Sequence, residues 1–338
     1  MSGVLTIEAI RASASRIAGA VVRTPVVRSE RLDDLVGTQV LLKAENLQRV
    51  GAFKMRGATN AVRVMLEAGE RPRGVVAFSS GNHAQAVALA AREHGLPAVI
   101  LMPEDAPPEK RAATEAYGAE VRVFDRAAHD RAEMAEEVVR ETGFALIPPY
   151  DDARVMAGQG TAALELFEDA GPLDALMVPI GGGGLIAGCA VAAAAVAPDC
   201  RVIGAEPDAS GDSMRSLDAG TWQGEPSGPT IADGQQAPQG QLTFEVMRGL
   251  VERSVVVSDD DIAAAMRALF ERAKLVAEPS GACGLAGLLR HAHDLGLAGA
   301  RVGVVISGGN VAPERFAAIT GSGTSAQELS THRPIPKL

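Results

Sequence analysis

The stretch ALMVPIGGGGLIAGCAVAAAAVA, residues 175–197, decides the fold class. Its first six residues form a continuous apolar run, which is typical of a parallel strand covered on both faces. Four glycines, Gly181 to Gly184, follow directly. The alanine-rich run from Leu185 to Ala197 is shorter than the ~20 residues that a membrane-spanning helix needs. We therefore predict a buried strand, a glycine turn and a buried helix of an α/β protein.

The same alternation of apolar runs and helical patterns continues along most of the chain. It predicts right-handed βαβ units in open parallel or mixed sheets. The predicted strands are Val40–Lys43, Gly74–Phe78, Ala98–Met102, Glu120–Phe124, Ala175–Pro179, Arg201–Ala205 and Arg301–Ile306. The predicted helices include Thr6–Gly19, Pro108–Tyr117, Ala127–Glu141 and Asp260–Leu275. The last follows Ser258, with Asp261 in the spacing of a capping box. Residues 220–240 are rich in Gly, Pro and Gln and are predicted to lie on the surface.

Composition narrows the class of protein. The 338 residues are enough for two domains, and a net charge of −10 disfavours nucleic acid or an anionic membrane as partner. The amphipathic pattern at the N-terminus does not resemble a signal peptide. The three cysteines, Cys189, Cys200 and Cys283, form neither a CxxC pair nor a metal-binding spacing. These features indicate an enzyme of the reducing cytoplasm.

Ligands of open α/β sheets bind beyond the carboxyl ends of the strands, and polar segments follow several predicted strands here. The segment Ser79-Ser80-Gly81-Asn82-His83 precedes a helical pattern. Its hydroxyls and free backbone N–H groups suit an anion such as a substrate carboxylate. Taken alone, the segment is better explained as an ordinary N-cap turn.

The glycine run after residue 180 allows the backbone to wrap closely around phosphate oxygens. It also matches a dinucleotide fingerprint, Gly182-x-Gly184-x-x-Ala187, and Glu206 lies about 20 residues on, where a ribose-binding acid is expected. An NAD-dependent oxidoreductase is therefore an alternative on this segment alone. The lysine of a nucleotide-triphosphate P-loop is absent.

Two further segments carry reactive groups. Ser307-Gly-Gly-Asn310 follows a predicted strand and offers a hydroxyl to a ligand. Lys54 lies in Gly51-Ala-Phe-Lys-Met-Arg-Gly57, where burial would lower the pKa of its amine and make it a nucleophile. Each signal is weak alone.

In this order the motifs resemble one known family. Lys-Ala-Glu-Asn-Leu-Gln from residue 43, the Lys54 segment, Ser-Ser-Gly-Asn-His-Ala-Gln, Gly-Gly-Gly-Gly-Leu and Ser-Gly-Gly-Asn span most of the chain. The sequence thus resembles the threonine dehydratase and serine racemase family, pyridoxal-phosphate enzymes of the tryptophan-synthase β fold (fold type II). That fold implies two open parallel or mixed sheet domains with the cofactor in the cleft between them.

The resemblance implies a role for each matching residue. Lys54 matches the lysine that forms the Schiff base, and Phe53 lies beside it. The remaining cofactor-binding positions are Asn82, near the ring hydroxyl, Ser307, at the pyridine nitrogen, and the phosphate cradle Gly181, Gly182, Gly183, Gly184 and Leu185. The positions that border the substrate carboxylate are Ser80, Gly81, Asn82 and His83.

These roles predict β-elimination from a small β-hydroxy amino acid, such as L-threonine or L-serine, to a 2-oxo acid and ammonia. Lys54 would take the α-proton as general base. Ser80 matches the serine that acts as acid on the opposite face in serine racemase. Serine racemase and a dehydratase of 3-hydroxyaspartate or another hydroxy amino acid therefore remain alternatives.

The family also implies a cation, a domain arrangement and a dimer. Glu206, Ser210 and Asp212 match the site for a divalent cation (Mg²⁺, Mn²⁺ or Ca²⁺) of serine racemase. We expect a large domain of residues 1–72 and 151–320, a small inserted domain of residues 73–150, a flexible tail of residues 321–338, and a homodimer. Pro148 stands where the family commonly has histidine, close to the expected active-site entrance.

Overall fold

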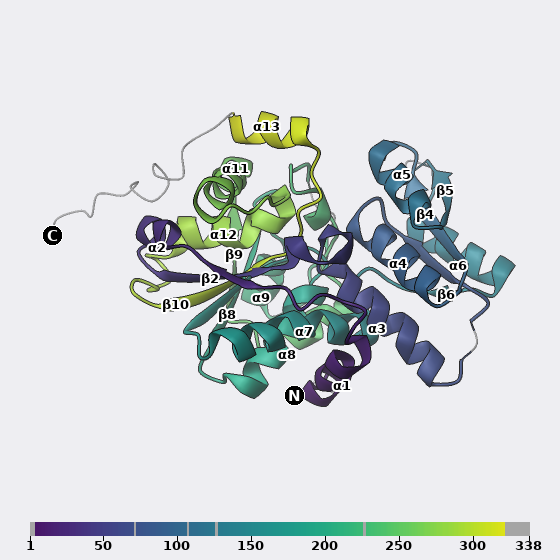
Figure 1. The fold of residues 1–338 in the computed structure, drawn as a ribbon, viewed down its shortest axis with the longest axis horizontal. Coiled ribbons are helices and arrows are strands. Elements are labelled where there is room, and N and C mark those ends of the chain that lie inside the picture. Colours follow the sequence, from purple (N-terminus) through teal and green to yellow (C-terminus); the bar gives the residue numbers. More distant parts are fainter. Residues whose placement is uncertain (1–3, 71, 107, 126–127, 226–227, 322–338) are drawn as a thin grey trace.

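The protein is described by a computed structural model over residues 4–70, 72–106, 108–125, 128–225 and 228–321. It contains two β-sheets, each accompanied by helices (Figure 1). The predicted tail lies outside the described residues except for Gly321, which is the last residue of a helix.

The larger sheet has the strand order β1 (Val26–Arg28), β2 (Gln39–Ala44), β10 (Arg301–Ile306), β7 (Ala175–Pro179), β8 (Arg201–Pro207) and β9 (Arg253–Val257). Only the β1–β2 pair in this sheet is antiparallel. The smaller sheet has the order β5 (Glu120–Phe124), β4 (Ala98–Pro103), β3 (Val75–Phe78) and β6 (Ala145–Leu146), and all its pairs are parallel. The predicted α/β class with one mixed and one parallel sheet is confirmed.

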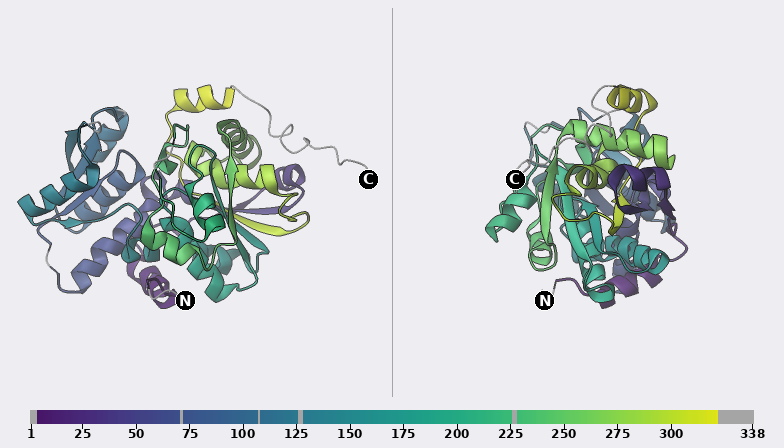
Figure 2. Two further views of the ribbon diagram at one scale, coloured as in Figure 1. Left: turned by 180° about the vertical axis from the view of Figure 1, so that it is seen from behind. Right: turned by 90° about the vertical axis from the view of Figure 1, so that its left-hand side faces the viewer.

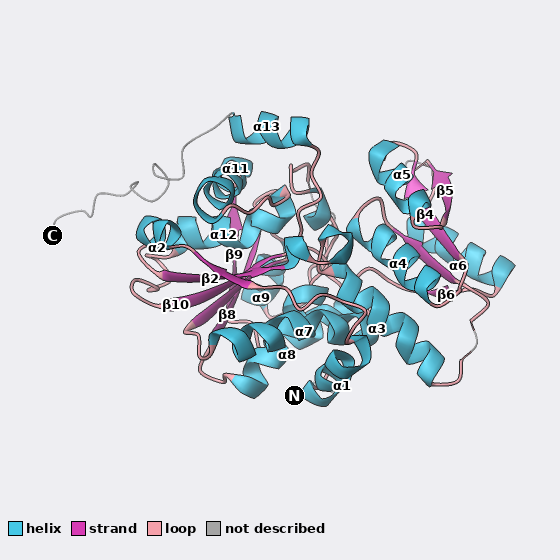
Figure 3. Ribbon diagram, in the orientation of Figure 1, coloured by secondary structure: helices cyan, strands magenta, loops and turns pink. Residues whose placement is uncertain are grey.

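The helices cover these sheets (Figure 3). The α-helices are α1 (Ile7–Ile17), α2 (Glu30–Val36), α3 (Lys54–Glu67), α4 (Asn82–Glu93), α5 (Pro108–Ala116), α6 (Arg131–Thr142), α7 (Ala153–Ala170), α8 (Gly184–Val196), α9 (Asp212–Ala219), α10 (Gln241–Met247), α11 (Asp259–Ala268), α12 (Pro279–His291) and α13 (Pro313–Gly321). Short 3-10 helices are η1 (Glu45–Leu47), η2 (Arg49–Gly51) and η3 (Asp233–Gln235), and η4 (Leu269–Ala273) is a π-helical turn.

Alternating residues of the central strands face two separate cores. Leu176 and Val178 pack with residues of α7 and α8, whereas Met177, between them, packs with α11 and α12. This alternation follows from the two-residue period of a strand. It also explains the continuous apolar runs in the sequence, because both faces of each strand are covered. The predicted buried helix after the glycines is α8.

The seven predicted strands are all present, and three further strands, the short β1 and β6 and the five-residue β9, were missed. The capping box at Ser258 and Asp261 is confirmed, but the predicted helix ends at Ala268 and continues as η4. Residues 220–240 were predicted to lie on the surface, and most of the described residues in this range are at least partly exposed. Gln235 and Gln239 in this segment are buried, and the Gln235 amide donates to the carbonyl oxygens of Ile180 and Ala205.

The strands of the smaller sheet all lie within the predicted inserted segment, residues 73–150. Helix α3, assigned to the large domain, contacts both α7 and α4. Its buried residues Met55, Ala58 and Ala61 share a core with the smaller sheet. Figure 2 shows α3 extending from the part of the molecule with the larger sheet toward the part with the smaller sheet. The division into domains therefore stays a prediction, and α3 is the element that connects its two parts.

Within the described ranges, no helix is both long enough and apolar enough to cross a bilayer.

Candidate active site

The lysine segment and the end of strand β10 lie side by side. The Phe53 N–H donates to the Ser307 carbonyl oxygen over 3.0 Å, and the Gly309 N–H donates to the Gly51 carbonyl oxygen over 2.9 Å. Ala52 and Gly308 form an isolated antiparallel bridge between these contacts. The backbone thus brings together two segments that the sequence analysis had singled out separately.

Lys54 is the first residue of α3, and its amine faces inward. The Nζ donates to the Pro149 carbonyl oxygen over 2.7 Å and lies 5.0 Å from the centre of the Phe53 ring. Burial lowers the pKa of Lys54 to about 8, because desolvation disfavours the ammonium. The direction of this shift is the one expected for a lysine in a small-residue and aromatic setting. The amine is therefore partly neutral near physiological pH.

The four glycines form a tight turn against Tyr150. A Cβ on Gly182 would lie 2.3 Å from the Tyr150 ring, and one on Gly184 would lie 3.0 Å from its Cα. Gly183 has a φ of +89°, which L side chains rarely adopt. The turn continues into α8, whose first N–H groups lack partners within the helix. The loop can therefore bind an anion through backbone N–H groups, and side chains would not fit in their place.

The segment from Ser79 to His83 connects β3 to α4. The Gly81 N–H donates to Ser79 Oγ over 3.1 Å, and Gly81 is the N-cap of α4 without a side-chain cap bond. Ser80 and Asn82 are partly exposed. The start of α4 therefore presents backbone N–H groups that a carboxylate can accept from.

The side chain of His83 points into the protein. Its Nε2 bonds the Ile147 carbonyl oxygen over 2.9 Å, and the residue is 2% exposed. Burial and the nearby Lys54 charge lower the pKa of His83 to about 3, so the ring is neutral. Because a carbonyl oxygen only accepts, Nε2 carries the proton and the buried Nδ1 has no partner. A role of His83 at a substrate carboxylate would therefore use its backbone, not its ring.

Two amides and an acid lie next to Ser307. Ser307 is buried, and its Oγ donates a long bond of 3.4 Å to the Ser280 carbonyl oxygen. Asn82 Nδ2 donates to Glu278 Oε1 over 2.6 Å, and Asn310 Nδ2 donates to Asn82 Oδ1 over 2.8 Å.

The sequence analysis missed Glu278. The available signal was a single acid within the otherwise uncharged run from Leu275 to Leu289.

The Lys-Ala-Glu motif and Arg56 form a buried ionic network. Arg56 contacts both Glu45 and Glu165, and Lys43 Nζ lies 2.6 Å from Glu165. Arg56, Lys43 and Glu45 are fully buried, so removing one partner would leave a buried charge uncompensated. This network fixes the start of α3, and thereby Lys54, relative to strand β2.

The predicted cation ligands lie at the end of β8. Glu206 accepts hydrogen bonds from Ser254 Oγ and from the backbone N–H groups of Ser213 and Met214. Burial and the Asp212 charge raise the pKa of Glu206 to about 7. Both oxygens of Glu206 thus accept hydrogen bonds from within the protein.

A connection runs from these carboxylates to the glycine turn. The Gln239 N–H donates to Asp212 Oδ2 over 2.7 Å, and the next N–H, that of Gly240, donates to the Gly182 carbonyl oxygen. Among the described residues, no group of three His, Cys, Asp or Glu side chains is arranged to hold a metal. A cation here would need the carbonyl oxygen of Ser210 and water besides the two carboxylates.

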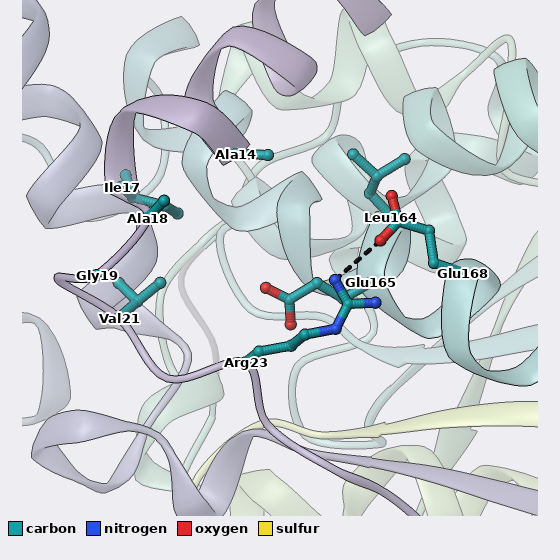
Figure 4. A pocket seen from close by; sticks show the side chains of 9 residues that line it. All are labelled: Ala14, Ile17, Ala18, Gly19, Val21, Arg23, Leu164, Glu165 and Glu168. Carbon is teal, nitrogen blue, oxygen red and sulfur yellow. Dashed lines mark hydrogen bonds and ion pairs between the residues drawn. The ribbon is translucent and has the colours of Figure 1, made fainter.

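A pocket lies between α1 and α7 and contains none of the predicted site residues (Figure 4). Its charged side chains are already paired, because Arg23 contacts Glu168 and Asp169 while Glu165 contacts Arg56. It is therefore not a candidate for the active site.

Comparisons with known proteins agree with this geometry. The family model described as "Pyridoxal-phosphate dependent enzyme" matches residues 17–308. The chain is 47% identical over 308 residues to an L-threo-3-hydroxyaspartate ammonia-lyase of Saccharomyces cerevisiae, covering 91% of this chain and 94% of that protein. It is 44% identical over 313 residues to a serine racemase of Schizosaccharomyces pombe, covering 92% and 96%. The structure of maize serine racemase superposes with a TM-score of 0.88, at 42% identity, over 92% and 95% of the two chains.

Proposed function

The chain belongs to the pyridoxal-phosphate-dependent enzyme family, and on that premise we propose that it eliminates water from a small β-hydroxy amino acid. The products are a 2-oxo acid and ammonia. The observation that carries this proposal is the Lys54 amine, with a pKa lowered to about 8, on a segment hydrogen-bonded to that of Ser307. The names of relatives refer to hydroxyaspartate, serine and threonine, which supports the reaction class.

The described residues fit pyridoxal phosphate. The glycine turn offers N–H groups without side chains that would obstruct a phosphate, and Lys54 offers an amine for an imine bond. The Ser307 hydroxyl, held only by one long bond, is available to a ring nitrogen. When bound, the cofactor supplies an electron sink for a carbanion at the substrate α-carbon.

Proton transfer at the α-carbon falls to Lys54. When it is not bonded to the cofactor, the neutral Lys54 amine would accept the α-proton at Nζ. The Pro149 carbonyl oxygen accepts from the ammonium and so holds the lysine in place. The low pKa of Lys54 keeps the amine available as a base at neutral pH.

The hydroxyl of Ser307 has a different effect from a carboxylate. It can bond the ring nitrogen, but it cannot keep it protonated as an ionised acid would. Charge at the α-carbon is then withdrawn only moderately, which favours prompt loss of the β-hydroxyl. Ser80, partly exposed at the start of α4, is the residue through which racemisation would compete, since it could return a proton from the opposite face.

A specific observation favours 3-hydroxyaspartate as a second candidate substrate. The Arg131 guanidinium lies 5.5 Å from the centre of the Phe78 ring. Phe78 is the residue that directly precedes the segment from Ser79 to His83. Its charge also acts on Tyr150, which packs on the glycine turn. A cation at this place suits a substrate with a second carboxylate, and two relatives at 47% identity are hydroxyaspartate ammonia-lyases. L-threonine and L-serine have no second carboxylate that the Arg131 guanidinium could bind.

A divalent cation at Glu206, Asp212 and the Ser210 carbonyl oxygen forms the next part of the proposal. Two buried carboxylates with raised pKa values suit a hard cation, which would replace the proton. The cation would act structurally, because Gln239 and Gly240 connect Asp212 to the glycine turn. It would thereby stiffen the phosphate site.

We also propose a homodimer in the cytoplasm. Leu47 and Val276 are 50% and 45% exposed, and Asn46, which precedes Leu47, donates from its Nδ2 to the Val276 carbonyl oxygen. Phe270, also 50% exposed, adds apolar surface that a second copy would cover. All three cysteines are buried, as suits a protein kept reduced. Sedimentation of the wild type and Leu47→Glu tests the dimer.

The function is tested by adding a panel of hydroxy amino acids to the purified holoenzyme with Mg²⁺. Release of 2-oxo acid from one member, faster than inversion of its α-carbon, supports the dehydratase. Inversion that is much faster than release would instead support a racemase. A protein that gains no visible absorption with pyridoxal phosphate would contradict both.

A further inference from the structure

Glu278 is a buried carboxylate for which the proposed reaction has no use. It is 6% exposed and occupies the N-cap of α12, but its side chain makes no bond to its own helix. Instead it lies over the segment after β10. The Glu278 N–H donates to the Gly308 carbonyl oxygen over 3.1 Å, and a Cβ on Gly308 would lie 2.1 Å from Glu278 Oε1. The absence of a side chain on Gly308 therefore leaves space for this carboxylate beside Ser307.

The hydrogen bonds around Glu278 fix the orientation of two amides. Val50 contributes a carbonyl oxygen, which only accepts, so the atom of Asn310 that contacts it over 2.6 Å is the amide nitrogen. The second hydrogen of that nitrogen goes to Asn82 Oδ1. Asn82 Nδ2 must then face Glu278, whose ionised carboxylate also only accepts. One hydrogen of Asn82 Nδ2 remains without a partner among these contacts.

That remaining N–H could be used by a third polar group of the cofactor. Pyridoxal phosphate has a phosphate, a ring nitrogen and a ring oxygen, and the oxygen is next to the carbon that binds the lysine. The glycine turn and Ser307 account for the phosphate and the nitrogen. Asn82 Nδ2 lies 3.1 Å from the Cβ position of Gly308, next to Ser307. Asn82 therefore offers an amide N–H close to the Ser307 segment, which a ring oxygen could accept.

We propose that Glu278 is a positioning residue, which holds the Asn82 amide so that its free N–H is directed at the cofactor's ring oxygen. This inference rests on the proposed binding of pyridoxal phosphate at Lys54. Glu278 does not touch the reacting atoms and acts through Asn82. Its charge reaches the ring oxygen through one amide.

The charge of Glu278 depends on the groups around it. Burial and the Asp233 carboxylate raise the pKa of Glu278 to about 7, against the opposing effects of the Asn82 bond, Lys110 and Arg315. Asp233 lies in η3, where it pairs with Lys110 of α5 and, over 3.8 Å, with Arg315 of α13. Protonation of Glu278 near neutral pH would remove a negative charge close to the ring oxygen.

The test compares Glu278→Ala, Glu278→Gln, Asn82→Ala and the Asn82→Ala/Glu278→Ala double variant, with Glu314→Gln as an exposed control. The readouts are the Kd for pyridoxal phosphate and the pH titration of the visible band. Glu278→Ala should weaken binding by about tenfold, which is the loss of one hydrogen bond to a charged group. Glu278→Gln keeps an acceptor oxygen, so its Kd should stay within about threefold of wild type while its pH titration shifts.

The double variant separates positioning from a general structural role. If Glu278 acts through Asn82, the double variant should bind the cofactor no worse than Asn82→Ala alone. Additive losses, or a Glu278→Ala variant with unchanged Kd, would overturn the inference. Should Glu278→Ala fail to fold, an unchanged pH titration in Glu278→Gln would overturn it. A wild-type protein that binds no pyridoxal phosphate would instead contradict the proposed function.

Discussion

The Phe53 N–H donates to the Ser307 carbonyl oxygen over 3.0 Å, and this bond ties the start of α3 to the end of strand β10. Lys54 follows Phe53 directly, so this bond holds the backbone of the lysine segment beside that of Ser307. A flat ligand that bonds both groups would bind without reordering either segment. Main-chain contacts with strand β10 and the buried ion pairs of Arg56 with Glu45 and Glu165 thus both fix the start of α3.

The low pKa of Lys54 predicts how fast the cofactor binds at different pH. Only the neutral amine attacks an aldehyde, and the folded pKa is about 8 instead of 10.5. The rate at which the visible band forms on mixing apoprotein with pyridoxal phosphate should rise with pH through about 8 and then level off. A rate that keeps rising up to the ordinary lysine pKa of about 10.4 would show a solvated amine.

A side chain in the glycine turn should disrupt the phosphate site. Gly182→Ala places a methyl group 2.3 Å from the Tyr150 ring, so the turn or the tyrosine must move. We expect the Kd for pyridoxal phosphate to rise by about tenfold or more. Gly249→Ala is the matched control, because nothing lies within 4 Å of its Cβ. Equal Kd values for the two variants would contradict the assigned cradle.

Arg131 should distinguish between substrates. Arg131→Ala removes a cation that only a second carboxylate would use, so kcat/KM for 3-hydroxyaspartate should fall by about tenfold to a hundredfold. For L-serine it should change by less than about threefold. Arg140→Ala, on the same helix and exposed, serves as control. Equal losses for both substrates would remove the argument for hydroxyaspartate.

The cation proposal predicts a pH-dependent stabilisation. Glu206 has a pKa raised from 4.5 to about 7, so the folded protein binds more protons than the unfolded chain between these values. Without metal, stability should therefore fall as pH rises from about 5 to 8. A cation replaces the proton, so Mg²⁺ should raise the Tm more at about pH 8 than at about pH 5. A chelated protein with the same Tm as the Mg²⁺ form at both pH values would contradict the site.

The sequence predicted seven of the ten strands in the described residues and the loops that follow several of them, because both depend on local patterns. Apolar runs mark strands such as β7 and β10, and the glycines mark the turn after residue 180. Contacts between distant segments were not predictable in this way. Tyr150 packing on the glycine turn and the burial of Gln235 depend on how the segments come together.

The directions in which side chains point at the site could not be predicted from sequence patterns either. His83 lies in the expected segment, yet its ring points to the Ile147 carbonyl oxygen. The sequence analysis missed Glu278 because its hydrogen bond with Asn82 joins the starts of two helices that are far apart in the chain. The resemblance identified the segments, and the structure shows which atoms within them face one another.

The central claim is that Lys54 holds pyridoxal phosphate, and its most direct test is the visible spectrum of the purified protein and of Lys54→Ala. We predict a band for the wild type, present on purification or after adding the cofactor, that survives gel filtration. The variant should bind the cofactor reversibly and lose that band. A band of equal intensity in Lys54→Ala would contradict the claim, as would a wild-type protein that stays colourless with the cofactor.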